Sequence, residues 1–279
     1  MARRLLGRTS VRDALDSAGI ALGAAGCDSP RLDAELLLAH VLGVGRAALI
    51  ASPERELEPD EARAFMDLAA RRRGREPVAY ILGSKGFRTI ELAVDGRVLV
   101  PRPETEHLVE AALTLPSGAR VADVGTGSGA IALALKAERP DLSVVATDTS
   151  AAALDVARAN AARLGLDVEF LHGDLLEPVA GALDAVLSNP PYVATGDALP
   201  PDIALHEPRE ALLAGPGGLE VIRRLVTAAA GIAFVALEVG AGQAAAVTDL
   251  VRAGGWPEVS TVHDLAGHER VVVGHGHAA

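Results

Sequence analysis

The chain has 279 residues, of which 49% are hydrophobic and only 3% aromatic, so it can bury a sizeable core built mainly from aliphatic and alanine packing. Its single cysteine, Cys27, excludes an intrachain disulfide and a metal site of the CxxC kind. Lysine and arginine balance aspartate and glutamate over residues 1–95, with 14 of each, so the whole net charge of −11 lies in residues 96–279. This acidic half argues against an enzyme of duplex DNA.

The sequence contains no segment typical of secretion or membrane insertion. The first eight residues are basic, but no apolar segment of a signal peptide follows them. The longest apolar run, residues 225–237, is too short to span a bilayer. We therefore expect a soluble, cytoplasmic protein that does not associate with membranes.

Residues 1–77 are predicted to form a small helical domain, because their apolar residues recur at helical spacing. Ser10, Ser29 and Glu58 mark three helix starts, and the last two are each followed by proline at the first helical position. The third helix ends in Arg71, Arg72 and Arg73. These arginines could contact a nucleic acid or an acidic partner, but a solvated helix C-terminus is the favoured interpretation.

Residues 78–101 are predicted to form a linking β-hairpin, because the periodicity changes there from helical to alternating. Asp95-Gly96 is the expected turn, with strands over residues 86–94 and 97–100.

From residue 102 to 279, strands and helices alternate, which predicts an α/β domain with a Rossmann-like, doubly wound and mostly parallel sheet. A hairpin is expected to close the sheet at residues 259–263 and 270–273. The predicted parallel strands cover residues 120–124, 142–147, 168–172, 183–188 and 232–238.

A glycine-rich loop after the first strand predicts a nucleotide cofactor, because glycines let the backbone approach a ligand closely. The loop consists of Gly125, Thr126, Gly127, Ser128 and Gly129. Asp148 follows about 20 residues later, the spacing at which an acidic side chain binds ribose hydroxyls. Both NAD and S-adenosylmethionine (SAM) satisfy this pattern.

Two further carboxylates favour SAM. Asp123, directly before the glycines, suits the ammonium of the methionine moiety. Asp174 ends the third strand, where it is placed to accept from the adenine amino group while Leu175 packs against the ring. Each of these acids also has a plain interpretation as a capping or loop carboxylate.

The segment Ser188-Asn189-Pro190-Pro191-Tyr192 follows the fourth strand. Its prolines end the strand, and Pro190 forces an extended backbone on Asn189, which is thus presented at the carboxyl end of the sheet. The Asn189 oxygen and the Pro190 carbonyl can accept both N–H bonds of a planar NH2 group, and Tyr192 can stack on its face. Hydride transfer has no use for this turn, whereas nitrogen methylation does.

These motifs together resemble the peptide chain release factor glutamine N5-methyltransferase family, of the PrmC/HemK type. The resemblance covers nearly the whole chain and includes the helical segment 33–40, residues 76–83, the Pro-Arg-Pro-Glu-Thr-Glu segment 101–106, the glycine loop, the Asn189 turn and residues 207–212. The chain departs from the family where an aromatic pair often follows Asp174, because Leu175-Leu176 stands there.

The resemblance implies a SAM-dependent protein methyltransferase whose substrate is the glutamine of the Gly-Gly-Gln loop of class I release factors, and whose helical domain helps to grip that factor. We expect a monomer that binds no nucleic acid directly. Asn189, Pro190 and Tyr192 are the predicted catalytic residues, and Pro191 joins them in substrate binding. The predicted cofactor site consists of Asp123, Gly125, Thr126, Gly127, Ser128, Gly129, Asp148, Asp174, Leu175 and Asn189.

His206 and Glu207 lie near this turn in sequence, but a loop role is favoured over a role as base. Two other functions remain open from the residues. An adenine-N6 methyltransferase of DNA or RNA uses the same turn on a flipped base. A non-catalytic SAM-binding partner of the translation machinery is the second alternative, against which the intact Asn189 motif argues.

Overall fold

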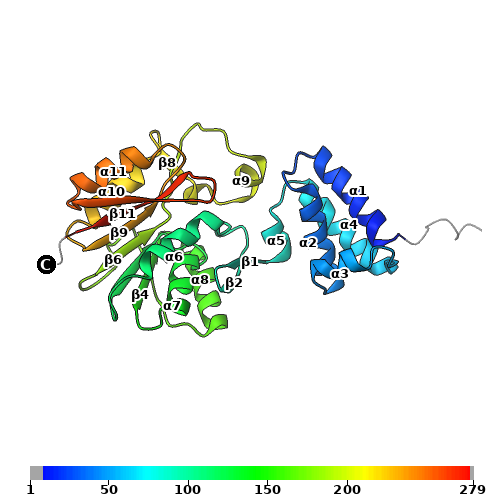
Figure 1. Cartoon of the computed structure of the whole chain (residues 1–279), viewed down its shortest axis with the longest axis horizontal. Coiled ribbons are helices and arrows are strands. Elements are labelled where there is room, and N and C mark those ends of the chain that lie inside the picture. Colours follow the sequence, from blue (N-terminus) through cyan, green and yellow to red (C-terminus); the bar gives the residue numbers. More distant parts are fainter. Residues whose placement is uncertain (1–8, 277–279) are drawn as a thin grey trace, which may run out of the picture. The chain divides into compact units, whose positions relative to one another are not determined.

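The computed structural model describes residues 9–276 and divides into two compact units (Figure 1). The helical unit comprises the chain through Gly83 together with Leu199–His206, and the sheet unit comprises Ser84–Ala198 together with the chain from Glu207 onward. The first eight residues, on which the expected lack of a secretory signal rests, lie outside the described residues. Within residues 9–276, no helix has the length and apolar character needed to cross a membrane.

The helical unit begins its helices where the sequence predicts. Ser10 caps the first, its Oγ accepting from the backbone N–H of Asp13 at 3.1 Å, and Glu58 forms a reciprocal capping box with Glu61. Leu22, Leu37 and Leu38 are fully buried among the helices. The helices are α1 (Val11–Ala24), α2 (Pro30–Leu42), α3 (Arg46–Ala51), α4 (Pro59–Arg73), α5 (Val78–Leu82) and α9 (Pro201–His206).

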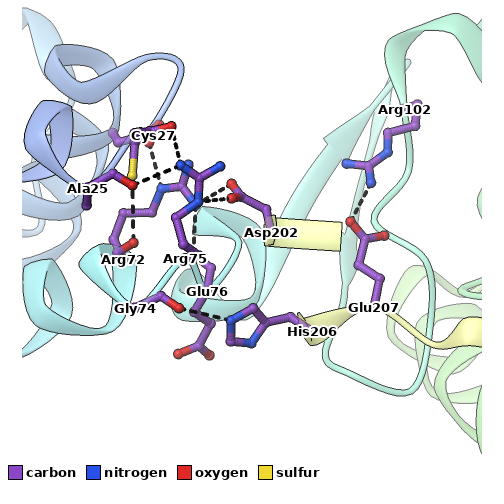
Figure 2. Close-up of polar contacts among 12 residues, drawn as sticks. Ala25, Cys27, Arg72, Gly74, Arg75, Glu76, Arg102, Asp202, His206 and Glu207 are labelled. Carbon is purple, nitrogen blue, oxygen red and sulfur yellow. Dashed lines mark hydrogen bonds and ion pairs between the residues drawn. The ribbon is translucent and has the colours of Figure 1, made fainter. Parts of the chain in front are cut away.

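Partly buried ion pairs hold α9 in the helical unit, although α9 lies far along the chain from the other helices (Figure 2). Arg72 Nη1 donates to Asp202 Oδ2 at 2.6 Å, Arg72 Nε donates to Asp33 Oδ2 at 2.7 Å, and Arg75 also pairs with Asp202. The expectation that Arg72 is solvated is therefore wrong, because its side chain is only 7% exposed and has two carboxylate partners. No local pattern in the sequence could predict a partner that lies 130 residues away.

The sheet unit contains one seven-stranded sheet in the order β10-β11-β9-β6-β3-β4-β5. Neighbours among β9, β6, β3, β4 and β5 are parallel, whereas β10 and β11 form the closing antiparallel hairpin, as the sequence predicts. The strand ranges are β3 (Arg120–Val124), β4 (Ser143–Asp148), β5 (Glu169–His172), β6 (Ala185–Ser188), β9 (Phe234–Glu238), β10 (Glu258–His263) and β11 (Glu269–His275). The predicted doubly wound α/β fold is confirmed.

Helices cover both faces of this sheet (Figure 1). On one face α6 (Glu106–Ala112) packs against α7 (Ala130–Glu138), with α8 (Ala151–Leu164) beside β4 and β5. On the other face α10 (Glu220–Ala228) packs against α11 (Ala244–Ala253). The chain order reverses at β3, which pairs with β4 on one side and with β6 on the other, and ligands of open α/β sheets bind at such a point.

The hairpin lies earlier in the chain than the sequence predicts. Its strands are β1 (Ser84–Phe87) and β2 (Ile90–Ala93), and the turn is at Arg88, whose φ is 49°. The guanidinium of Arg88 is held by Glu110 and Glu138, which stabilises this left-handed turn. Gly96 does not adopt the positive φ that an Asp-Gly hairpin turn requires, and Asp95 instead accepts locally from the Arg97 backbone N–H at 3.0 Å.

Short elements connect the larger ones. A parallel pair joins β7 (Val193–Ala194), directly after the Asn189 turn, to β8 (Leu213–Gly215). This pairing closes the loop from which α9 extends. The short 3-10 helices are η1 (Pro103–Thr105) and η2 (Arg209–Ala211).

Candidate active site

A cleft of about 220 Å³ lies at the carboxyl ends of β3, β4, β5 and β6, within the sheet unit. The structure brings eight of the predicted site residues together in its walls: Gly125, Gly127, Asp148, Asp174, Leu175, Asn189, Pro190 and Pro191. Five predicted residues do not line it: Asp123, Thr126, Ser128, Gly129 and Tyr192.

The glycines of the loop serve two different structural purposes, ligand access and close helix packing. Gly125 and Gly127 have φ values of 73° and 55°, and a Cβ at either position would meet no protein atom within 4 Å. Both therefore leave open space at the cleft for a ligand to approach the backbone. At Gly129, by contrast, a Cβ would lie 2.8 Å from Leu133 Cδ1, so this glycine allows α7 to pack closely on the loop.

Asp123 is buried beneath this loop, with 1% of its surface exposed. Its Oδ2 accepts from Thr126 Oγ1 at 2.6 Å and from the Ala132 backbone N–H at 3.1 Å, which ties the loop to the start of α7. Its Oδ1 has no hydrogen-bond partner among residues 9–276. Burial raises the pKa of Asp123 to about 7.

Asp148, at the end of β4, is held rigidly in the cleft wall. Its Oδ2 accepts from the Gly127 backbone N–H at 2.9 Å, and its Oδ1 accepts from the Ser150 backbone N–H at 2.8 Å. Burial raises its pKa, although these two donors oppose the shift. Each oxygen keeps lone pairs for further donors, such as the hydroxyls of a ribose.

Asp174 and Leu175 follow β5 at the other end of the cleft. Leu175 has a φ of 48°, a left-handed conformation that is uncommon for a side chain of its size. Thr147 Oγ1 holds this conformation by donating to the Leu175 carbonyl at 2.8 Å. Asp174 forms an ion pair with Arg224, which also lines the cleft and was missed by the sequence analysis.

Hydrogen bonds to neighbouring segments hold the Asn189 turn in place. Ser188 Oγ donates to the Val124 carbonyl at 2.6 Å, which fixes the end of β6 against β3. Asn189 Nδ2 donates to Thr105 Oγ1 at 3.1 Å, and Thr105 Oγ1 donates in turn to Glu238 Oε2 at 2.6 Å. In the described part of the chain, no group donates to Asn189 Oδ1 or to the Pro190 carbonyl, so both remain acceptors.

Tyr192 does not line the cleft. Its hydroxyl lies 3.5 Å from Glu238 Oε1, and its carbonyl accepts from Gln243 Nε2 at 2.9 Å. A Cβ on Gly240 would lie 3.1 Å from the Tyr192 ring, so the ring packs closely on that backbone. Burial raises the pKa of Tyr192 to about 12, and the phenol stays neutral.

Thr105 and Glu238 were not identified from the sequence, although a signal for Glu238 existed. A carboxylate at the end of an apolar run singled out Asp148 and Asp174, and Glu238 ends the apolar run 232–238 in the same way. Glu207 has the expected loop role: its Oε2 accepts from the Val100 backbone N–H at 3.1 Å, and its other oxygen accepts from Arg102 (Figure 2).

This cleft fits SAM. Its wall offers the open backbone of Gly125 and Gly127 and the fixed carboxylate of Asp148. The buried Oδ1 of Asp123, beneath the glycine loop, has no hydrogen-bond partner in the described part of the chain. These are the groups that a ligand with a ribose and an ammonium would satisfy.

Comparison with known proteins identifies the family. The release factor glutamine methyltransferase of Caulobacter vibrioides is 42% identical over 278 residues, covering 95% of this chain and 94% of that protein. This chain belongs to the release factor glutamine methyltransferase family. The enzyme of the same name from Deinococcus radiodurans is 43% identical over 271 residues, covering 94% of this chain and 97% of that protein.

Family membership extends over both units. Residues 13–83 match the family described as the PrmC N-terminal domain, and residues 104–211 match the methyltransferase small domain. Among solved structures, the hMettl16 catalytic domain in complex with MAT2A 3′UTR hairpin 6 has a TM-score of 0.55 at 18% identity, covering 76% of this chain and 83% of that chain. That likeness concerns the fold alone. The chain is thus a SAM-dependent methyltransferase, and the nicotinamide alternative is ruled out.

Proposed function

We propose that this enzyme transfers a methyl group from SAM to N5, the side-chain amide nitrogen, of the glutamine in the Gly-Gly-Gln loop of class I release factors. The observation that carries the proposal is the Asn189 turn in the cleft wall, which offers two acceptors, Asn189 Oδ1 and the Pro190 carbonyl, to which no group of residues 9–276 donates. Relatives that share more than 40% identity with the chain carry the name release factor glutamine methyltransferase, which supports the proposal.

The chemistry explains why an amide needs this arrangement. The lone pair of an amide nitrogen is delocalised into its carbonyl, so the nitrogen is a weak nucleophile. SAM, when bound, supplies an electrophilic methyl group on a sulfonium. Asn189 and Pro190 accept the two N–H bonds and hold the nitrogen so that its remaining lone pair faces that methyl group.

Methyl transfer would place positive charge on the amide nitrogen. The two acceptor oxygens stabilise this charge, because both are fixed dipoles before the reaction begins. One N–H proton leaves after transfer and passes to water, so no strong base is required. We propose that the predicted cofactor residues hold the ligand in their assigned roles, Asp123 at the ammonium, Asp148 at the ribose, and Asp174 with Leu175 at the adenine.

We further propose the division of the chain into residues 1–77 as the release-factor-binding domain, residues 78–101 as the linker, and residues 102–279 as the methyltransferase domain. In the same proposal, the enzyme acts as a monomer in the cytoplasm and binds no nucleic acid directly. We also propose that Tyr192, whose hydroxyl lies 3.5 Å from Glu238 Oε1, packs its ring against the plane of the substrate amide.

The test is transfer of labelled methyl from SAM to a purified, unmodified class I release factor. A factor with Gln→Ala in its Gly-Gly-Gln loop is the control. Label on the wild-type factor alone would support the proposal. Bound SAM without label on either factor would contradict it, and labelling of adenine-containing RNA or DNA would then favour the alternative methyltransferase.

A further inference from the structure

We propose that Thr105 and Glu238 are positioning residues that fix which end of the Asn189 side-chain amide faces the cleft. The inference rests on the proposed function, in which Asn189 Oδ1 accepts an N–H bond of the substrate amide. Neither residue lines the cleft, so both act through Asn189.

The direction of the hydrogen bonds determines the orientation of Asn189. A threonine hydroxyl has one proton, and in Thr105 this proton is donated to Glu238 Oε2 over 2.6 Å. Only lone pairs then remain on Thr105 Oγ1 for Asn189, 3.1 Å away. The Asn189 atom facing Thr105 must therefore be the NH2 donor, which leaves its carbonyl oxygen for the substrate.

The reverse orientation would oppose the reaction. If Thr105 donated its proton to Asn189, the amide of Asn189 would turn over and present its own NH2 group to the NH2 group of the substrate. Two donors would then face one another, and the substrate nitrogen would lose one of its two acceptors. The Thr105–Glu238 pair thus selects the productive orientation before the substrate arrives.

Burial makes this selection strong. Thr105 is 4% exposed and Glu238 is 2% exposed, so water does not compete for their hydrogen bonds. The two residues come from elements far apart in sequence, η1 before α6 and the end of β9, and they meet only in the folded sheet unit. The Pro-Arg-Pro-Glu-Thr-Glu segment therefore supplies a hydroxyl behind the Asn189 turn in addition to starting a helix.

The ionisation of Glu238 links this device to pH. Burial, and to a smaller extent Glu104 from η1, raise its pKa to about 7, against the opposing effects of Thr105, Tyr192 and Arg270 from β11. Ionised Glu238 can only accept, which keeps the Thr105 proton directed away from Asn189. Protonated Glu238 can donate to Thr105 Oγ1 and release the Thr105 proton toward Asn189. Activity is therefore expected to rise as Glu238 loses its proton.

The test compares Thr105→Val, which replaces the hydroxyl with a methyl group of similar size, with Thr105→Ser, which keeps the hydroxyl. In the full-length enzyme with an unmodified release factor, Thr105→Val should lower kcat about tenfold or more, because Asn189 loses its acceptor. SAM Kd, measured by calorimetry, should stay within about twofold of the wild type, since neither residue lines the cleft. Thr105→Ser should restore most of the turnover.

Three results would overturn the positioning role. The first is a wild-type kcat in Thr105→Val, and the second is a loss of kcat in Thr105→Ser equal to that in Thr105→Val. The third is a loss of SAM affinity in Thr105→Val as large as its loss of kcat. If Thr105→Val fails to fold, Glu238→Gln decides the question. Its kcat should lack the wild-type rise around pH 7, whereas an unchanged pH profile would refute the inference. Absence of transfer by the wild-type enzyme itself would overturn the proposed function together with this role.

Discussion

Asp123 offers a direct test of how the cofactor is held. Burial raises the pKa of its carboxyl group to about 7 in the free protein, and its Oδ1 accepts no hydrogen bond from residues 9–276. If the ammonium of SAM pairs with Oδ1, that pKa should fall toward its ordinary value of 3.8. Binding must then release the proton that Asp123 carries at mildly acidic pH.

The magnitude follows from linkage. A carboxyl with a pKa of about 7 in the free protein and 3.8 in the complex releases about 0.9 proton on binding at pH 6. The pairing of Asp123 with the ammonium contributes fully to SAM affinity above pH 7, and this contribution is lost as the pH falls. The Kd of SAM should therefore rise about tenfold for each pH unit between pH 7 and pH 5. The ammonium itself stays protonated throughout this range, because its pKa is near 8, about as for other α-amino groups.

The assay is isothermal calorimetry of SAM binding in two buffers with different ionisation enthalpies, at pH 6 and pH 8. Asp123→Asn should release no proton, should bind SAM independently of pH between 5 and 7, and should bind it more weakly than the wild type at pH 8. Asp148→Asn is the matched control, since burial also raises the pKa of Asp148 and it lies in the cleft wall. The pairing of Asp123 with the SAM ammonium would be refuted if Asp123→Asn released as many protons on binding as the wild type. It would also be refuted if the wild type released none.

Three further predictions concern single side chains. Asn189→Ala should reduce kcat about 10²–10³-fold, which is the usual effect of removing one preorganised polar group, while the Kd of SAM changes little. A loss of SAM affinity as large as the loss of turnover would exclude the assigned role of Asn189. Asp148→Ala should weaken SAM binding about tenfold or more, because the ribose loses its acceptor, and calorimetry showing wild-type affinity would contradict the assignment. Asp202→Asn should speed amide hydrogen exchange across Leu199–His206 about tenfold, since Arg72 and Arg75 lose a partly buried partner. The exposed Asp197→Asn is its control, and equal exchange in both variants would count against a tethering role for the ion pairs.

The sequence by itself determined the layers of the fold and most of the cleft wall. Strand and helix periodicities predicted the parallel sheet, and the order of motifs placed Gly125, Asp148, Asp174 and Asn189 after successive strands. Because the carboxyl ends of parallel strands meet at one edge of the sheet, side chains that follow different strands in sequence must lie together in space. This is a local rule, so the sequence was sufficient for it.

Tertiary structure alone decided what stands behind these residues. Thr105, Asn189 and Glu238 come from three separate segments, and their hydrogen bonds depend on the distances between η1, β6 and β9, which no local pattern encodes. The burial of Arg72 likewise depends on Asp202, 130 residues away. Local patterns predict which groups a strand end presents, whereas the partners that orient and desolvate those groups are set by the packing of distant segments.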